Sequence, residues 1–121
     1  MKIWINKANE NWIADRIRKE FMESESDSVT NNIDCADVVW MLCPWLWRYI
    51  SPTDLNNKKV VCTIHHIDTS KFDVMDFMER DTIVDCYHVP CDITKAEVAK
   101  IAIIAITMIS SIRVKAFLCL V

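Results

Sequence analysis

The chain has 121 residues, a length typical of one small domain, and 52% of them are hydrophobic, enough for a core. Its formal net charge of −3 argues against a nucleic-acid-binding surface, which is normally basic. Glycine is absent, and this excludes the glycine-rich phosphate loops of P-loop and dinucleotide-binding proteins. The N-terminal stretch soon turns polar, so no signal peptide is expected, and the cysteines are expected to be reduced thiols in a cytoplasmic protein.

The first predicted element is a strand at 2–6, where KIWIN alternates and is rich in isoleucine and tryptophan. A helix is predicted next, over 12–23, because its apolar residues recur at helical spacing opposite charged ones. The apolar stripe consists of Ile13, Ile17 and Phe21. Asn9 or Asn11 is expected to cap this helix, since an asparagine side chain can accept a hydrogen bond from a first-turn N–H group.

The middle of the chain predicts one buried strand and several short connections. A short strand near 29–33 is one expectation. The near-continuous apolar run at 37–43 predicts a strand covered on both faces, as in parallel sheets. LWRYI at 46–50 predicts a short helix, and the polar residues 51–59 predict a surface turn or a single helical turn.

The next elements are a strand at 59–66, a helix at 71–80 and a strand at 83–88, each predicted from its apolar pattern. A further helix is predicted to start near Thr94, because Glu97 follows it in the spacing of a capping box. Alternating strands and helices predict an α/β fold: a doubly wound, mainly parallel sheet with flanking helices, as in Rossmann-like domains.

The C-terminal residues 99–121 depart from this pattern. The run IAIIAITMISSI carries no charge but is shorter than the roughly 20 residues that span a bilayer, so the first interpretation is a buried helix or strand. The alternatives are a membrane-associated segment over 101–121, or a tail foreign to the rest of the fold. The expected division of the chain is therefore 1–98 and 99–121.

Polar residues follow the ends of the predicted strands. Carboxyl ends of parallel strands meet at one edge, where ligands bind. His65 and His66, the candidate catalytic residues, end one strand, and one of them is expected to face a cleft because adjacent strand residues point opposite ways. Asn6, Lys7 and Glu10 follow the first strand. The candidate substrate-binding residues at this edge are Asn9, Asn11, Trp45, Asp68, Tyr87 and His88.

A zinc site is the alternative interpretation of part of this set. Residues of ligand type lie close together in the sequence: Cys62, His65, His66, Cys86, His88 and Cys91. No pair of cysteines has the C-x-x-C spacing of structural zinc sites, and Cys62 lies in mid-strand. No metal or other cofactor is therefore expected.

Several segments together resemble the N-terminal half of a retaining GT-B glycosyltransferase that uses nucleotide-sugar donors. They are MKIWINKANENWIADRIRKEF, DVVWMLCPW, KKVVCTIHHIDTSKFD and DCYHVPCDIT, and the resemblance covers 1–98. In that family two Rossmann-like domains face each other across a cleft. The N-terminal domain mainly holds the acceptor, and the second domain binds the nucleotide sugar. The resemblance implies that His65 or His66 reaches toward the donor sugar.

The chain departs from this family after the first strand and after the last. NKANENW stands where the family has a glycine-rich loop, which puts the phosphate contact of that loop in doubt. Residues 99–121 resemble neither domain, so a truncated or frameshifted product, or one half of a split protein, is expected.

The resemblance thus implies an acceptor-side half, inactive alone, that binds a sugar or glycan acceptor and meets the nucleotide-sugar donor only through a second domain. The alternatives are a carbohydrate-binding or interaction module without catalysis, and a small metal-binding protein.

Overall fold

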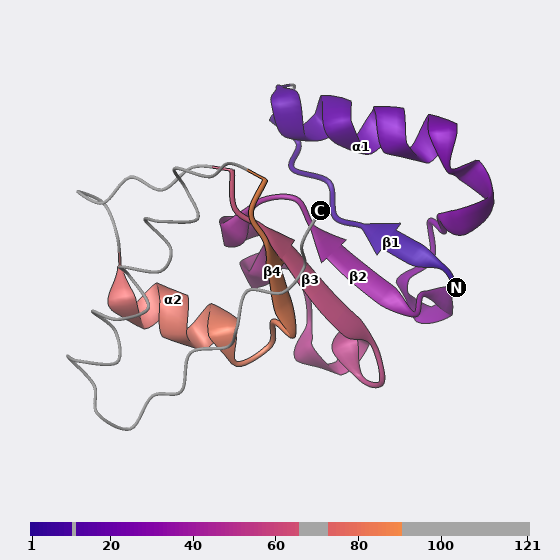
Figure 1. Ribbon diagram of the computed structural model, residues 1–121. Coiled ribbons are helices and arrows are strands. Elements are labelled where there is room, and N and C mark those ends of the chain that lie inside the picture. Colours follow the sequence, from indigo (N-terminus) through magenta and orange to yellow (C-terminus); the bar gives the residue numbers. More distant parts are fainter. Residues whose placement is uncertain (11, 66–72, 91–121) are drawn as a thin grey trace.

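The computed structural model describes residues 1–10, 12–65 and 73–90, and its centre is a parallel sheet of four strands (Figure 1). The strands are β1 (Ile3–Ile5), β2 (Val38–Met41), β3 (Lys59–Thr63) and β4 (Cys86–His88), paired in the order β1-β2-β3-β4. The α-helices of the described residues are α1 (Ile13–Ser24) and α2 (Val74–Asp81). The strands expected from the apolar runs are confirmed, each shorter than its run, and the fold is a mixed α/β fold.

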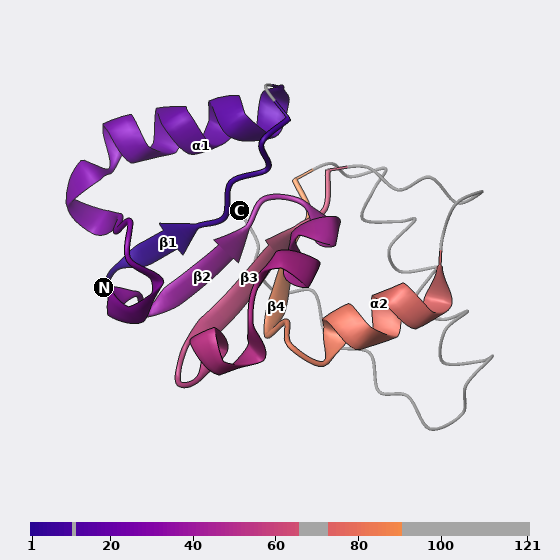
Figure 2. The same ribbon diagram turned by 180° about the vertical axis from the view of Figure 1, so that it is seen from behind.

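The two helices cover opposite faces of the sheet (Figures 1 and 2). Phe21 of α1 packs edge-on against Trp40 of β2, with ring centroids 5.1 Å apart. Phe77 of α2 stacks on Tyr87 of β4, with centroids 6.3 Å apart. The strand register places Tyr87 on the same face as Met41, which follows Trp40 and so points the opposite way. Burial on both faces explains why the central strands are continuous apolar runs.

After β1 the chain first reaches the outer edge of that strand, where Val29 lies. It then returns to the other edge of β1, where β2 pairs, and continues outward to β3 and β4. Val29, reached through α1, forms an isolated parallel bridge with Ile3, and the N–H of Thr30 donates to the Ile3 carbonyl at 2.9 Å. The N–H of Val38 donates to the carbonyl of Lys2 at 3.1 Å. Because successive carbonyls of a strand point to opposite edges, Val29 and β2 pair with opposite edges of β1. The short strand expected around Val29 is thus reduced to a single bridge.

The first turn of α1 is organised by Asp15 and not by an asparagine cap. Trp12 stands at the N-cap position, and its side chain makes no capping bond. The carboxylate of Asp15 instead accepts from the backbone N–H groups of Glu10, at 2.7 Å, and Asn9, at 3.2 Å. Asn9 adopts a φ of 56°, a left-handed conformation that asparagine tolerates better than most residues. The Asn9 cap was therefore wrong, and Asn11 lies outside the described residues.

The buried side of α1 is also rotated from the expected one. Ile13 is 54% exposed, whereas Ala14 is buried and Ile17 and Phe21 are half-buried. Arg18 follows Ala14 by one helical turn and is half-buried on the same side. The helix therefore turns a guanidinium, and not an isoleucine, toward the end of the sheet.

Short 3-10 helices connect the strands. η3 (Pro44–Tyr49) follows β2 and η4 (Pro52–Leu55) precedes β3, which confirms the short helix and the single turn expected there. Each begins with a proline, whose fixed φ suits a first helical position. Between α1 and β2 lie η1 (Ser26–Ser28) and η2 (Ile33–Cys35).

The core follows the middle strands and the start of η3. Its fully buried side chains include Val39, Met41, Leu42, Leu46, Val60, Ile64 and Val84. Within the residues that the structure describes, no helix is both long and apolar enough to cross a membrane. The helix expected near Thr94 and the apolar tail at 101–121 lie outside those residues.

Candidate functional site

A hollow opens at the carboxyl end of β1, between the start of α1 and η3. Its volume is about 870 Å³. The residues lining it include Asn6, Lys7, Asn9, Arg18, Trp45 and Tyr49. The chain leaves β1 and β2 in opposite directions at this point, and such a point is where open parallel sheets bind ligands.

Two aromatic side chains of η3 form one wall of the hollow. Trp45 is 43% exposed and Tyr49 is 77% exposed, while Leu46 between them is buried in the core. Burying Leu46 fixes η3 against the sheet and leaves the two rings in contact with water. An exposed aromatic ring offers an apolar face on which a sugar ring can stack.

Asn6 fixes η3 to the end of β1. Its buried side-chain amide donates to the carbonyl of Leu46 at 3.2 Å, and its backbone N–H donates to the carbonyl of Trp40 at 3.1 Å. A buried amide that is bonded in this way holds the aromatic wall in place. Asn9 and Asn31 are exposed where they line the hollow, and their amides can bond the hydroxyl groups of a ligand.

The charged residues that line the hollow are Arg18, Lys7 and Glu10 among those that the structure describes. Arg18 is half-buried, and its Nε donates to the carbonyl of Ile5, the last residue of β1, at 3.1 Å. Lys7 is exposed. Positive charge thus exceeds negative charge here, although the chain as a whole carries a formal charge of −3.

Two of the predicted substrate-binding residues, Asn9 and Trp45, lie in this hollow. His65 and His88 are not among the described residues that line it, although the strand ends were expected to form one common site. Three further candidates lie outside the described part of the chain: Asn11, His66 and Asp68.

His88 takes part in a hydrogen-bond chain across three strands. The indole N–H of Trp40 donates to the hydroxyl of Thr63 at 2.8 Å, and this hydroxyl lies 3.0 Å from Nδ1 of His88. The Thr63 hydroxyl accepts from Trp40 and can either donate to Nδ1 or accept from it, so the direction of this second bond depends on the tautomer of the imidazole. The chain ties β2, β3 and β4 together on the face that α1 covers.

His65 stands just beyond β3 and is half-buried. Burial lowers the pKa of its imidazole below the usual 6.5, while a hydrogen bond with the backbone of Leu42 acts in the opposite sense. A lowered pKa keeps the imidazole neutral at pH 7, the form that can accept a proton. His65 does not line the hollow.

Tyr87 was predicted to line the edge of the sheet at the carboxyl ends of the strands, but the structure places it elsewhere. It is buried beneath α2, where its ring stacks on Phe77 and its hydroxyl donates to Oδ1 of Asp81 at 3.1 Å. Burial raises the pKa of this hydroxyl above its usual value. The physical reason is the alternation of strand residues: His88 faces the α1 side, so its neighbour Tyr87 faces α2.

Among the described cysteines, Cys43 and Cys62 are buried thiols of low reactivity. Burial raises the pKa of Cys62 to about 12, and burial together with nearby carboxylates raises that of Cys43 to about 11. Cys35 is exposed and carries a free thiol. Cys86 is disulfide-bonded, so the expectation of reduced thiols was wrong for this residue. Within the described residues, no three histidine, cysteine or acidic side chains are grouped so that they could hold a metal ion.

Sequence reasoning missed Arg18, Tyr49 and Asn31 as lining residues. Arg18 lies one helical turn after Ala14, so its side of the helix could be inferred from the sequence once Ala14 was known to be buried. Tyr49 and Asn31 had none, because each reaches the hollow from a segment whose path depends on packing with the sheet.

Comparisons with protein-family models, with curated proteins and with solved structures gave no match for this chain. The site is therefore defined by its own geometry. An aromatic wall, exposed amides and two cations surround a hollow large enough for a small polar molecule. Such a lining can stack on a ring and bond several hydroxyl groups at once.

Proposed function

We propose that the chain is a doubly wound, Rossmann-like domain that binds a sugar at the end of β1, as the acceptor-side domain of a GT-B type glycosyltransferase. The observation that carries this proposal is the place of the hollow. It lies where the chain turns from one winding direction to the other, between the bridge of Val29 to Ile3 and the pairing of β1 with β2.

The lining of the hollow supports a sugar as the ligand. A sugar ring has an apolar face, which Trp45 or Tyr49 can cover, and a rim of hydroxyl groups, which Asn9 and Asn31 can bond. The buried Asn6 holds the aromatic wall before any ligand arrives. A wall fixed in advance reduces the entropy lost when a ligand binds.

Transfer of a sugar needs more than this site. The phosphates of a nucleotide-sugar donor have to be neutralised and its leaving group held in place. Because the chain has no glycine for a phosphate loop, we assign the donor to a second domain and expect binding without transfer by this chain alone. His65, kept neutral by burial, is the described histidine that we assign to the donor side.

A carbohydrate-binding module without catalysis is the second candidate function. The separation of the hollow from His65 and His88 favours it, because a binding module needs no histidine beside the ligand. Both candidate functions predict sugar binding. They differ once a donor-binding domain is supplied, because only the glycosyltransferase domain should then take part in turnover of a nucleotide sugar.

The test is titration of the ¹⁵N-labelled chain with glucose, galactose and N-acetylglucosamine, followed by NMR at the tryptophan indole groups. We expect the Trp45 indole signal to shift and Trp45→Ala to weaken binding about fivefold, which corresponds to the loss of about 1 kcal/mol of ring stacking. Trp12→Ala is the matched control, because Trp12 is 72% exposed and lies outside the hollow. Equal effects of the two substitutions, or no binding of any sugar, would contradict the proposal.

A further inference from the structure

We propose that the hollow selects a sugar that carries a negatively charged group, a carboxylate or a phosphate, through Arg18 and Lys7. This inference rests on the proposed function and names the chemical class of its ligand. The observation behind it is a cationic side chain in the lining of the hollow, Arg18, which is held in place by the end of β1.

Arg18 is held in an orientation suited to an anion. Its Nε donates to the carbonyl of Ile5 at 3.1 Å, which fixes the guanidinium at the end of the strand. Within the described part of the chain, its two Nη groups make no hydrogen bond. A guanidinium anchored at Nε presents those groups as a fork, which matches two oxygens of a carboxylate or phosphate.

The charge around this fork favours an anion. Lys7 adds a second cation to the lining, and Glu10 is the one acid among the described lining residues. Asp15, one turn before Lys19 on α1, is occupied with the backbone N–H groups of Asn9 and Glu10. A net positive hollow in a chain with a formal charge of −3 concentrates anions at one place on its surface.

The remaining lining favours a sugar over a free anion. The volume of about 870 Å³ far exceeds that of a phosphate ion, and Trp45 and Tyr49 provide ring faces that an inorganic anion does not use. The geometry therefore combines one charged contact with one stacked ring, which is the recognition pattern of an acidic or phosphorylated sugar.

The first experiment removes the charge of the ligand and keeps its shape. The chain of residues 1–121 is titrated by NMR with glucuronic acid, its methyl ester, glucose, glucose 6-phosphate and inorganic phosphate. We expect glucuronic acid or glucose 6-phosphate to bind about tenfold more tightly than the methyl ester and glucose, because a charge-assisted hydrogen bond is lost in the neutral sugars. The preference should shrink as salt is added.

The second experiment removes the charge of the protein. Arg18→Gln should abolish the preference for the charged sugar, and Arg18→Lys should restore only part of it, because lysine keeps the charge and loses the fork. Lys7 is exposed and makes no hydrogen bond or ion pair within the described residues, so Lys7→Met should leave the fold undisturbed. This variant tests whether the second cation of the lining contributes to the preference for the charged sugar. Lys19→Met, an exposed lysine of α1 outside the hollow, is the control and should change neither affinity.

The outcomes separate this inference from the proposed function. Equal binding of charged and neutral sugars overturns the inference and leaves sugar binding intact. No binding of any sugar overturns both. Binding of inorganic phosphate as tight as that of glucose 6-phosphate shows that the ring contributes nothing, and this also overturns both.

Discussion

Asp76 of α2 joins three side chains from two segments, and its removal is expected to destabilise the protein strongly. Its carboxylate accepts from the indole N–H of Trp47 at 3.3 Å and from Nε of Arg48 at 3.1 Å, both on η3. It also pairs with Nη1 of Arg80, one turn further along α2, at 3.3 Å. Asp76→Ala breaks all three contacts at once.

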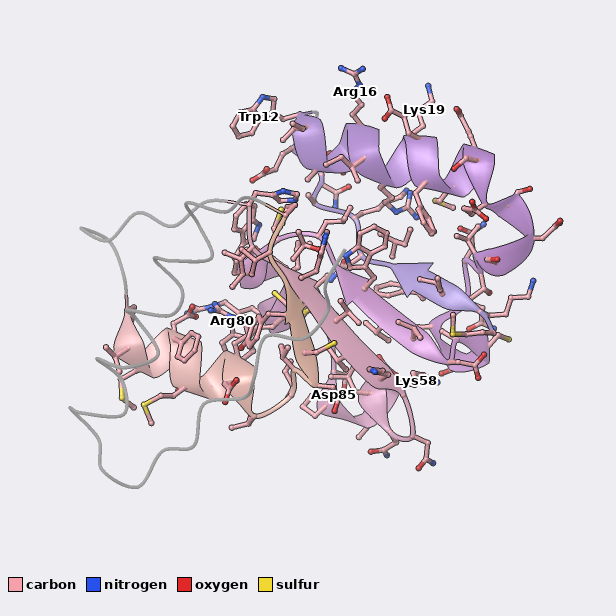
Figure 3. All side chains as sticks on the ribbon, in the orientation of Figure 1. Trp12, Arg16, Lys19, Lys58, Arg80 and Asp85 are labelled. Atoms are coloured by element: carbon pink, nitrogen blue, oxygen red, sulfur yellow. The ribbon has the colours of Figure 1, made fainter. Side chains whose placement is uncertain are left out.

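The contacts differ in what their loss costs. Arg48 is exposed, so water and salt screen its ion pair and the loss of this pair costs little. The N–H of Trp47 loses a charged acceptor, which costs about 1 kcal/mol. Arg80 is only 6% exposed and lies between α2 and the sheet (Figure 3), so its charge is left without this carboxylate in a buried place. This last loss costs about 2 kcal/mol, taken at the low end for a pair whose acid is partly exposed.

Together these losses predict that Asp76→Ala lowers the free energy of unfolding by about 3 kcal/mol, a large part of the stability of a small domain. Urea unfolding followed by tryptophan fluorescence measures it. Arg48→Ala is the matched control, because it removes the exposed ion pair and the contact of Arg48 with the Trp47 ring but leaves Asp76 paired with Arg80, so it should cost much less stability. If the two variants lose the same stability, the buried charge of Arg80 does not depend on Asp76 and the reasoning is refuted.

Two further predictions concern titratable side chains. Because folding lowers the pKa of His65 below its ordinary 6.5, the unfolded chain takes up a proton first on acidification, and stability falls as the pH drops through that value. The wild type should therefore lose more unfolding free energy between about pH 7.5 and about pH 5.5 than His65→Gln does, and equal losses would remove His65 as the cause. Iodoacetamide applied at about pH 8 should modify Cys35 and spare Cys43 and Cys62, whose thiols are buried and stay protonated. Peptide mapping by mass spectrometry reads this out, and labelling of Cys62 in the native chain would contradict its burial.

The strands were predictable because their signal is local. A run such as 38–43 is apolar on both faces, and its length and its β-branched residues favour a strand between two covering layers. The bridge at Val29 was harder to place. Its neighbours are polar, and a single pairing with Ile3 leaves almost no pattern in the sequence. The side of α1 that is buried depends on how the helix lies against Trp40, which no periodicity reports.

The site was predictable only as far as strand ends could be located. Trp45 and Asn9 follow strands, and both line the hollow. Tyr87 also ends a strand, but it faces α2, and the sequence does not say which face of β4 the next layer covers. Arg18 reaches the hollow from the middle of a helix, so its role follows from the packing of α1 over the end of β1.

The pairing of strands in chain order bears on how the protein acquires its structure during synthesis. Each strand from β2 to β4 joins the strand made immediately before it, so a growing chain always meets an edge that already exists. The residues that pair between adjacent strands are nevertheless far apart in the sequence, 35 positions for Ile3 and Val38 and 21 for Val38 and Lys59, so the sheet forms through non-local contacts, which slow folding. Within the described residues β4 is the last strand to join, and the Trp40–Thr63–His88 hydrogen-bond chain then connects β2, β3 and β4.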